Sequence, residues 1–88
     1  MALPTERQTW PRRVVRNPRV LEGEPTLEGT RVPVRSVVEG IRLAMSVDEI
    51  VDAYPMLDGR SVETALAYYR QHRKEIDRHI AENADPID

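Results

Sequence analysis

The chain has 88 residues, no cysteine and a formal net charge of −2. This length allows one small domain, and the lack of cysteine excludes a disulfide framework and any thiolate metal site. No apolar run is long enough to cross a membrane, and residues 1–13 lack the apolar stretch of a signal peptide, so we expect a cytoplasmic protein.

The charged residues are unevenly distributed along the chain. Residues 1–35 hold seven arginines and four glutamates, whereas residues 36–66 hold two arginines and six acidic residues. Any contact with phosphate groups is therefore expected to begin in the N-terminal third. The small overall charge argues against a protein that coats nucleic acid.

Residues 1–13 are expected to form an extended arm, because they contain two prolines and show no apolar periodicity. Trp10 is unfavourable in water, so we expect it to pack against the domain or against a second subunit. Arg12, Arg13 and Arg16 could reach phosphates or a minor groove, as basic arms do. The alternative is a tail whose arginines only confer solubility.

Short β-branched runs and turn signals follow the arm. We expect a strand at 14–16, ended by Asn17-Pro18, and a second strand at 20–21. Two further extended segments, 26–27 and 31–32, would lie on either side of a tight turn at Glu28-Gly29. Such short strands need helices to cover one face.

From Pro33 onward the apolar residues have helical spacing. Those at 34, 37, 38 and 41 predict a first helix that ends near Leu43 or Ala44. Gly40 inside it is expected to allow another element to approach closely. Ser46 and Glu49 form the pattern of a capping box, which predicts the start of a second helix that ends at Pro55.

A third helix is expected to begin at Asp58, which we favour as its cap over Ser61. Its apolar stripe at 62, 65, 66 and 69 narrows beyond Tyr69 to Ile76 and Ile80. So thin a seam usually meets a partner helix, so we expect the helix to continue to a dimer or partner interface. That interface is expected to include Trp10, Tyr69, Ile76 and Ile80.

These elements predict a mainly α fold, in which a small N-terminal β element precedes a trihelical, helix-turn-helix-like domain. We divide the chain into the arm at 1–13, the β element and trihelical core at 14–75, and a helix extension with the C-terminal tail at 76–88. A two-turn helix, a break of about four residues and a longer helix are typical of a helix-turn-helix.

The helix-turn-helix interpretation places the first turn of the third helix in the major groove of DNA. Arg60 could bond guanine or phosphate, and Ser61 and Thr64 could contact base edges or phosphates. The alternative is that any compact trihelical domain has this spacing and Arg60 is simply solvated. Glu63 on the same turn counts against DNA contact.

Catalytic, cofactor and metal chemistry have little support, so we expect no enzyme. His72 and His79 are two helical turns apart, too far to share an ion. The cluster of Asp48, Glu49 and Asp52 is explained by capping and by a solvated helix face. The sequence contains no glycine-rich phosphate loop, nucleophile motif or cofactor fingerprint.

Four motifs in a fixed order resemble a known prokaryotic family, the domain of unknown function 433. They are PTLEGTRVPV at 25–34, MSVDEI at 45–50, YPML at 54–57 and ALAYY at 65–69. The resemblance implies a homeodomain-like trihelical domain preceded by a small β element. It also implies an antitoxin that binds its own promoter as a homodimer and blocks a PIN-like nuclease toxin encoded nearby. The alternative is a protein-protein interaction module that inhibits a partner nuclease without binding DNA.

Overall fold

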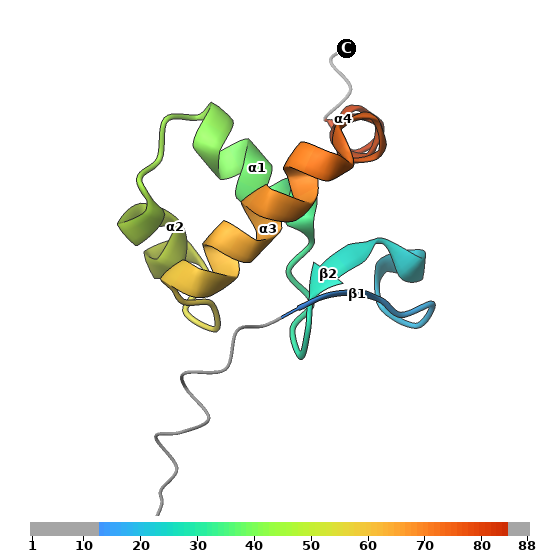
Figure 1. Ribbon diagram of the computed structural model, residues 1–88, viewed down its shortest axis with the longest axis horizontal. Coiled ribbons are helices and arrows are strands. Elements are labelled where there is room, and N and C mark those ends of the chain that lie inside the picture. The colour runs from blue at the N-terminus through green and yellow to red at the C-terminus, as the bar shows by residue number, and fades with distance from the viewer. Residues whose placement is uncertain (1–12, 85–88) are drawn as a thin grey trace, which may run out of the picture.

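A computed structural model describes residues 13–84, which form a two-stranded β element and four helices (Figure 1). Strand β1 (Val14–Arg16) pairs antiparallel with β2 (Pro25–Leu27), with Val15 opposite Thr26. All three residues of β2 are buried. Because proline cannot donate to a ladder, its place at the first residue of β2 is one of the few that a strand tolerates.

The expectation of a strand at 20–21 is wrong. Residues 21–23 instead form a short 3-10 turn, η2 (Leu21–Gly23), in which Leu21, Glu22 and Gly23 have φ of 50°, 58° and 85°. Positive φ is incompatible with a strand. The segment at 31–32 is not a strand either, because only an isolated antiparallel bridge joins Thr26 to Pro33.

The tight turn expected at Glu28-Gly29 is present, and Gly29 adopts φ of 78°. Thr30 stabilises this turn, because its hydroxyl donates to the Leu27 carbonyl at 2.8 Å and accepts from the Val32 N–H at 3.0 Å. The turn therefore brings Val32 beside β2 and directs the chain into the first helix.

The first two helices begin within one residue of where the sequence indicates. Helix α1 (Val34–Arg42) has Pro33 as its N-cap, whereas the sequence places Pro33 at the first helical position, so the helix begins one residue later than expected. Helix α2 (Val47–Ala53) carries the expected capping box: the Glu49 N–H donates to the Ser46 hydroxyl at 3.1 Å, and the Ser46 N–H donates to the Glu49 carboxylate at 2.8 Å. Of the apolar stripe of α1, only Ile41 is exposed.

The expectation of one long third helix is wrong. Helix α3 (Gly59–Gln71) ends at His72, whose φ of −136° and ψ of 41° break the helix, and α4 (Arg73–Glu82) follows in a new direction (Figure 1). The start of α3 agrees with expectation, because the Asp58 carboxylate accepts from the Ser61 N–H at 2.9 Å.

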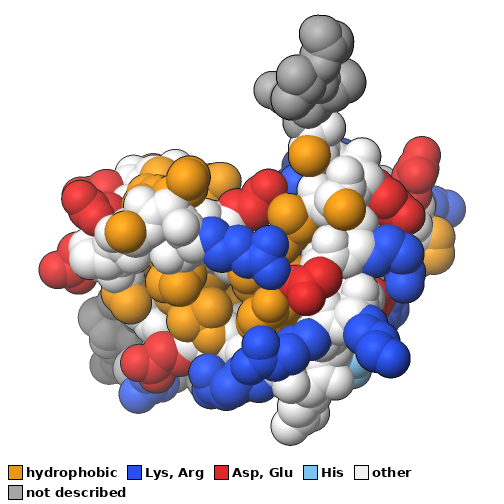
Figure 2. All heavy atoms as spheres, turned by 90° about the horizontal axis from the view of Figure 1, so that it is seen from above, with side chains coloured by type: hydrophobic (Ala, Val, Ile, Leu, Met, Phe, Trp, Pro, Cys, Tyr) orange, Lys and Arg blue, Asp and Glu red, His pale blue; other side chains and the backbone are white. Residues whose placement is uncertain are grey.

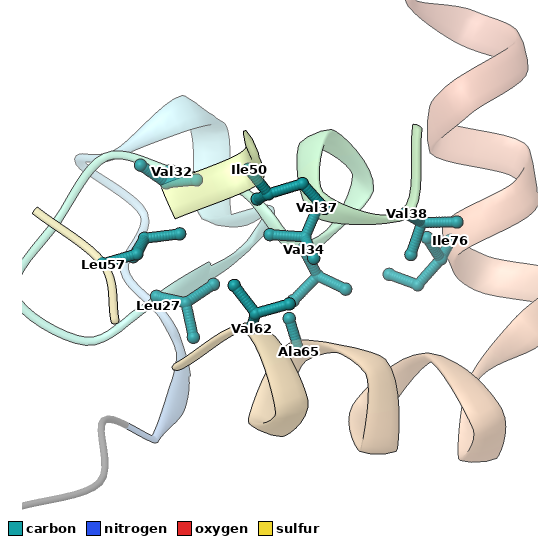
Figure 3. Packing of buried hydrophobic residues seen from close by; sticks show 10 residues of the cluster. All are labelled: Leu27, Val32, Val34, Val37, Val38, Ile50, Leu57, Val62, Ala65 and Ile76. Carbon is teal, nitrogen blue, oxygen red and sulfur yellow. The ribbon is translucent and has the colours of Figure 1, made fainter. Parts of the chain in front are cut away.

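The core lies between α1 and α3 and is closed at one end by α4 (Figure 3). Leu57, in the connection between α2 and α3, is buried in it as expected. Gly40 confirms the expected close approach, because a Cβ built there would lie 3.1 Å from Ile50 Cγ1. The ten buried apolar residues are Leu27, Val32, Val34, Val37, Val38, Ile50, Leu57, Val62, Ala65 and Ile76.

The expectation that Ile76 lies at a dimer or partner interface is wrong. Its side chain is 0% exposed and points from α4 toward Val38 of α1 (Figure 3). It is therefore part of the chain's own core and is not available to a partner helix. Within residues 13–84, no helix has both the length and the apolarity needed to span a membrane.

Candidate nucleic-acid interface

Helices α2 and α3 pack against each other with a short connection at 54–58. The Leu57 N–H donates to the Tyr54 carbonyl at 2.8 Å, which tightens this connection, and the buried Leu57 side chain anchors it. The carboxylate of Asp58 then satisfies the first turn of α3. A short helix, a tight anchored connection and a longer helix are the parts of a helix-turn-helix.

The exposed side of α3 is the complement of its apolar stripe. Val62 and Ala65 are buried, which turns the opposite side of the helix toward solvent. We call that side the outer face of α3. Its exposed or half-exposed positions are Arg60, Glu63, Thr64, Ala67, Arg70 and Gln71.

Arg60 and Thr64 lie on this outer face, as the helix-turn-helix interpretation requires. Ser61 does not, and its expected DNA contact is wrong. Its side chain is 0% exposed, and its hydroxyl donates to Asp58 at 3.0 Å. The hydroxyl reinforces the cap from within the protein, so it cannot reach a base edge.

Of the N-terminal arginines expected to contact phosphate, the structure describes Arg13 and Arg16, and each pairs with a different acid. Trp10 and Arg12 lie outside the described residues. Arg13 is exposed and pairs with Glu28 at 3.1 Å across the β element.

Arg16 is held against the helices. Its guanidinium donates to the Glu75 carboxylate, with one N–O distance of 2.7 Å, and also to the Tyr68 hydroxyl. This hydrogen bond stabilises the charged carboxylate and therefore holds the pKa of Glu75 below its usual value. A phosphate contact by Arg16 would disrupt this bond, so we do not place Arg16 in the interface.

Two of the residues expected at a partner interface, Tyr69 and Ile80, are partly buried. The Tyr69 hydroxyl donates to Asp77 at 2.8 Å and accepts from Arg42 at 3.1 Å, while Arg42 pairs with Asp77 at 2.6 Å. This cluster joins α1, α3 and α4. Ile80 packs against the core cluster but keeps part of its surface exposed.

Sequence reasoning missed three basic side chains on either side of the break between α3 and α4. Arg70, Arg73 and Lys74 are all exposed, and the Arg73 guanidinium lies 5.3 Å from the centre of the Tyr69 ring. The next acid, Glu75, is turned away to Arg16. The signal for Arg70 was available, because helical spacing places it outside the predicted apolar stripe.

The acidic residues of 36–66 are largely engaged in helix caps and on α2. Glu49 and Asp58 accept hydrogen bonds at the starts of α2 and α3, and Asp48 lies in the first turn of α2. Among the positions that we assign to the outer face of α3, Glu63 is the one acidic residue. The acidic balance of this stretch of sequence therefore overstates the negative charge of the outer face.

No group of three or more His, Asp or Glu side chains in the described part of the chain could hold a metal ion. The two histidines lie in separate surroundings. His72 stacks on Tyr68 with ring centres 3.9 Å apart, whereas His79 Nδ1 lies 3.8 Å from Glu24.

Comparison with known proteins places these residues in a family. The family model described as "Protein of unknown function (DUF433)" matches residues 14–69, which is more than half of the chain. The chain belongs to the DUF433 family. The match includes β1, β2 and the first three helices except for the last two residues of α3, whereas α4 lies beyond it.

A solved DUF433 structure has a similar fold. The crystal structure of a DUF433 member protein from Anabaena variabilis ATCC 29413 superposes with a TM-score of 0.74 at 28% identity, and the match covers 91% of this chain and 87% of that one. The similarity in fold therefore extends beyond the 14–69 match.

A curated relative is longer than this chain. "Uncharacterized protein y4eO" of Sinorhizobium fredii (strain NBRC 101917 / NGR234) is 36% identical over 55 residues. Those residues are 62% of this chain and 25% of that relative, so the chain spans only a part of its length.

Proposed function

We propose that this protein is a DNA-binding antitoxin that recognises its own promoter through the outer face of α3 and neutralises a partner toxin. The observation that carries the DNA-binding half is the pairing of a capped, anchored α2–α3 unit with an outer face that is free of core packing. The toxin-neutralising half is supported by what the resemblance to the domain of unknown function 433 implies, namely an antitoxin that accompanies a PIN-like nuclease.

The dimensions of α3 suit the major groove. Thirteen residues form a helix of about 20 Å, and a major groove about 12 Å wide admits a single helix. Arg60 and Thr64 near the start of α3 are the candidates for base contacts. Arg70 near the far end of α3, and Arg73 and Lys74 at the start of α4, are all exposed, and they are candidates for phosphate contacts that set the orientation of α3.

The proposal includes a homodimer. Two copies related by a two-fold axis would present two α3 helices about 34 Å apart, which is the spacing of successive major grooves on one side of DNA. The operator would then be a palindrome. We place the protein in the cytoplasm, where promoter and toxin both occur.

The second candidate is an interaction module that inhibits a partner nuclease without binding DNA. It is favoured by Glu63 in the middle of the outer face and by the net charge of −2. In that case the outer face of α3 would meet a basic protein surface instead of phosphate.

Binding to DNA from upstream of the protein's own gene, followed by fluorescence anisotropy at several salt concentrations, distinguishes the two candidates. The DNA-binding proposal predicts that log K falls with log salt with a slope of several units, because arginines displace counterions. Arg60→Ala and Arg70→Ala should each weaken binding without lowering the melting temperature.

The matched control is Arg19→Ala, since Arg19 is an exposed arginine in the loop between β1 and β2. It should bind DNA as the wild type does. Absence of binding at low salt would contradict the DNA-binding proposal, and equal losses in all three variants would show that α3 is not the contact surface.

A further inference from the structure

The turn between β2 and α1 is held at both ends by the core. The Thr30 N–H donates to the Leu27 carbonyl at 3.0 Å, and the Leu27 N–H donates to the Val32 carbonyl at 3.0 Å. Leu27 is 0% exposed and Val32 is 5% exposed. The turn therefore has a defined position relative to the helices, although its tip projects below the β element in Figure 1.

Arg31, the last residue of this turn, is exposed and forms no ion pair with another residue of 13–84. Several other arginines do pair with an acid, namely Arg13, Arg16, Arg35, Arg42 and Arg78. Glu28, the acid of the same turn, pairs with Arg13 at 3.1 Å. The positive charge of Arg31 is therefore available to a ligand.

The turn lies beside the connection from which α3 starts. Val32, which follows Arg31, belongs to the same buried cluster as Leu57, and the two side chains lie next to each other in Figure 3. Leu57 directly precedes Asp58, the cap of α3. Strand β1 also contacts α3, so the β element and the helix-turn-helix unit form one continuous body.

The opposite side of the molecule has a different surface. Seen from above, away from the turn, basic and acidic side chains are interspersed among apolar ones (Figure 2). A phosphate approaching that side would meet acidic side chains as well as basic ones.

The order of the elements gives the turn a specific place in a complex with DNA. When the third helix of a trihelical domain lies in the major groove, the segment before the first helix can reach the adjacent minor groove and place arginines in it. Here the segment before the first helix is the turn, and Arg31 lies three residues before Val34, where α1 begins.

We infer that Arg31 enters the minor groove next to the major groove that α3 occupies. The inference rests on the proposed function, because the position of α3 defines which minor groove is adjacent. A narrow minor groove over A·T pairs has an enhanced negative potential that attracts arginine. The operator is therefore expected to have A·T pairs beside the bases that α3 covers.

Fluorescence anisotropy with the duplex from upstream of the protein's own gene tests the contact. Arg31→Ala should weaken binding at least about fivefold and lower the slope of log K against log salt by about one, because one cation fewer displaces counterions. The melting temperature should be unchanged, since the side chain is exposed. Arg19→Ala is the matched control and should bind as the wild type does, because Arg19 is exposed in the loop at the other end of the β element.

Tethered cleavage locates the contact on the DNA. Because the chain has no cysteine, an iron–EDTA group can be attached through Arg31→Cys alone. Radicals formed there should cut the DNA backbone at the edge of the bases that α3 protects. The same group on Arg19→Cys should cut at least about fivefold less.

Base substitution at the cut positions tests which groove is read. A G·C pair in place of an A·T pair puts the guanine amino group into the minor groove, which should weaken binding by the wild type but not by Arg31→Ala. An inosine·C pair has the major-groove atoms of G·C but lacks this amino group, so it should restore the wild-type affinity.

Wild-type affinity in Arg31→Ala, beside weak binding by Arg60→Ala and Arg70→Ala, would overturn this inference alone. Equal cutting from positions 31 and 19, or an equal response of the wild type and Arg31→Ala to the guanine amino group, would also overturn it. Weak binding by Arg31→Ala with normal binding by both α3 variants would refute the proposed contact of α3 and support that of Arg31. A wild type that binds no DNA would refute both.

Discussion

At the scale of the residue, polar side chains of the same type have opposite roles on neighbouring turns of α3. Ser61 is buried and its hydroxyl donates to Asp58 at 3.0 Å, whereas Thr64 is partly exposed on the outer face. A hydroxyl side chain by itself does not indicate which role it has. The position relative to the cap and to the apolar stripe decides it.

Ser61→Ala should lower the free energy of unfolding by about 1 kcal/mol, because it removes a buried hydrogen bond to the Asp58 cap. Its affinity for DNA should be unchanged. Urea unfolding and anisotropy measure the two quantities.

Thr64→Ala is the matched control and should show the reverse pattern, with weaker DNA binding and nearly unchanged stability. If Ser61→Ala weakens DNA binding more than Thr64→Ala does, the assignment of the two side chains is wrong.

At the scale of the element, the ion pair between Arg16 and Glu75 connects β1 to α4. The hydrogen bond from Arg16 lowers the pKa of Glu75 below its ordinary value. A carboxyl with a lowered pKa in the folded protein contributes stability above its pKa in the unfolded chain, about 4.3, and loses that contribution as pH falls through its folded pKa.

Glu75→Gln should therefore be less stable than the wild type at pH 7, and the difference should shrink as the pH falls below about 4.3, toward the folded pKa of Glu75. Thermal unfolding across this pH range measures the difference. Glu82→Gln is the control. Glu82 Oε2 lies 3.8 Å from Arg78 Nε, and both side chains are 60% exposed, so this substitution should change the stability little at any pH. A difference for Glu75→Gln that does not change with pH would contradict this account of the pair.

Elements whose signals are local could be predicted from the sequence. The starts of α2 and α3 depend on Ser46, Glu49 and Asp58 acting within one turn, and each is where the sequence places it. The three positive φ values at 21–23 could not be predicted, because only Gly23 of these residues favours that conformation.

The break at His72 depends on contacts that are distant in sequence. Ile76 and Ile80 keep the same spacing whether they face this chain's core or a partner helix, so the pattern alone could not decide between the two. Two contacts show that α4 packs on this chain. Ile76 points toward Val38 of α1, and Glu75 forms an ion pair with Arg16 of β1. The outer face of α3 was predictable in part: Arg60 and Thr64 were identified, whereas Ser61 was misplaced and Arg70 was missed.

At the scale of the whole molecule, α4 completes the core although it lies beyond the residues that match the family model. Ile76→Ala should lower the free energy of unfolding by about 2–5 kcal/mol, because it leaves a cavity between α4 and α1. Urea unfolding at one fixed protein concentration measures this loss.

Ile80→Ala is the comparison for Ile76→Ala and should cost less, since Ile80 is only partly buried. A loss for Ile76→Ala no greater than that for Ile80→Ala would show that α4 does not contribute to the core as described.

For the whole molecule, the account depends on the outer face of α3 meeting DNA. The most direct measurement is an NMR titration of the isotope-labelled chain with a duplex from upstream of its own gene. The account predicts that the amide signals of Arg60, Thr64, Ala67 and Arg70 shift most. Signals that do not move, or shifts confined to the loop between β1 and β2, would contradict it.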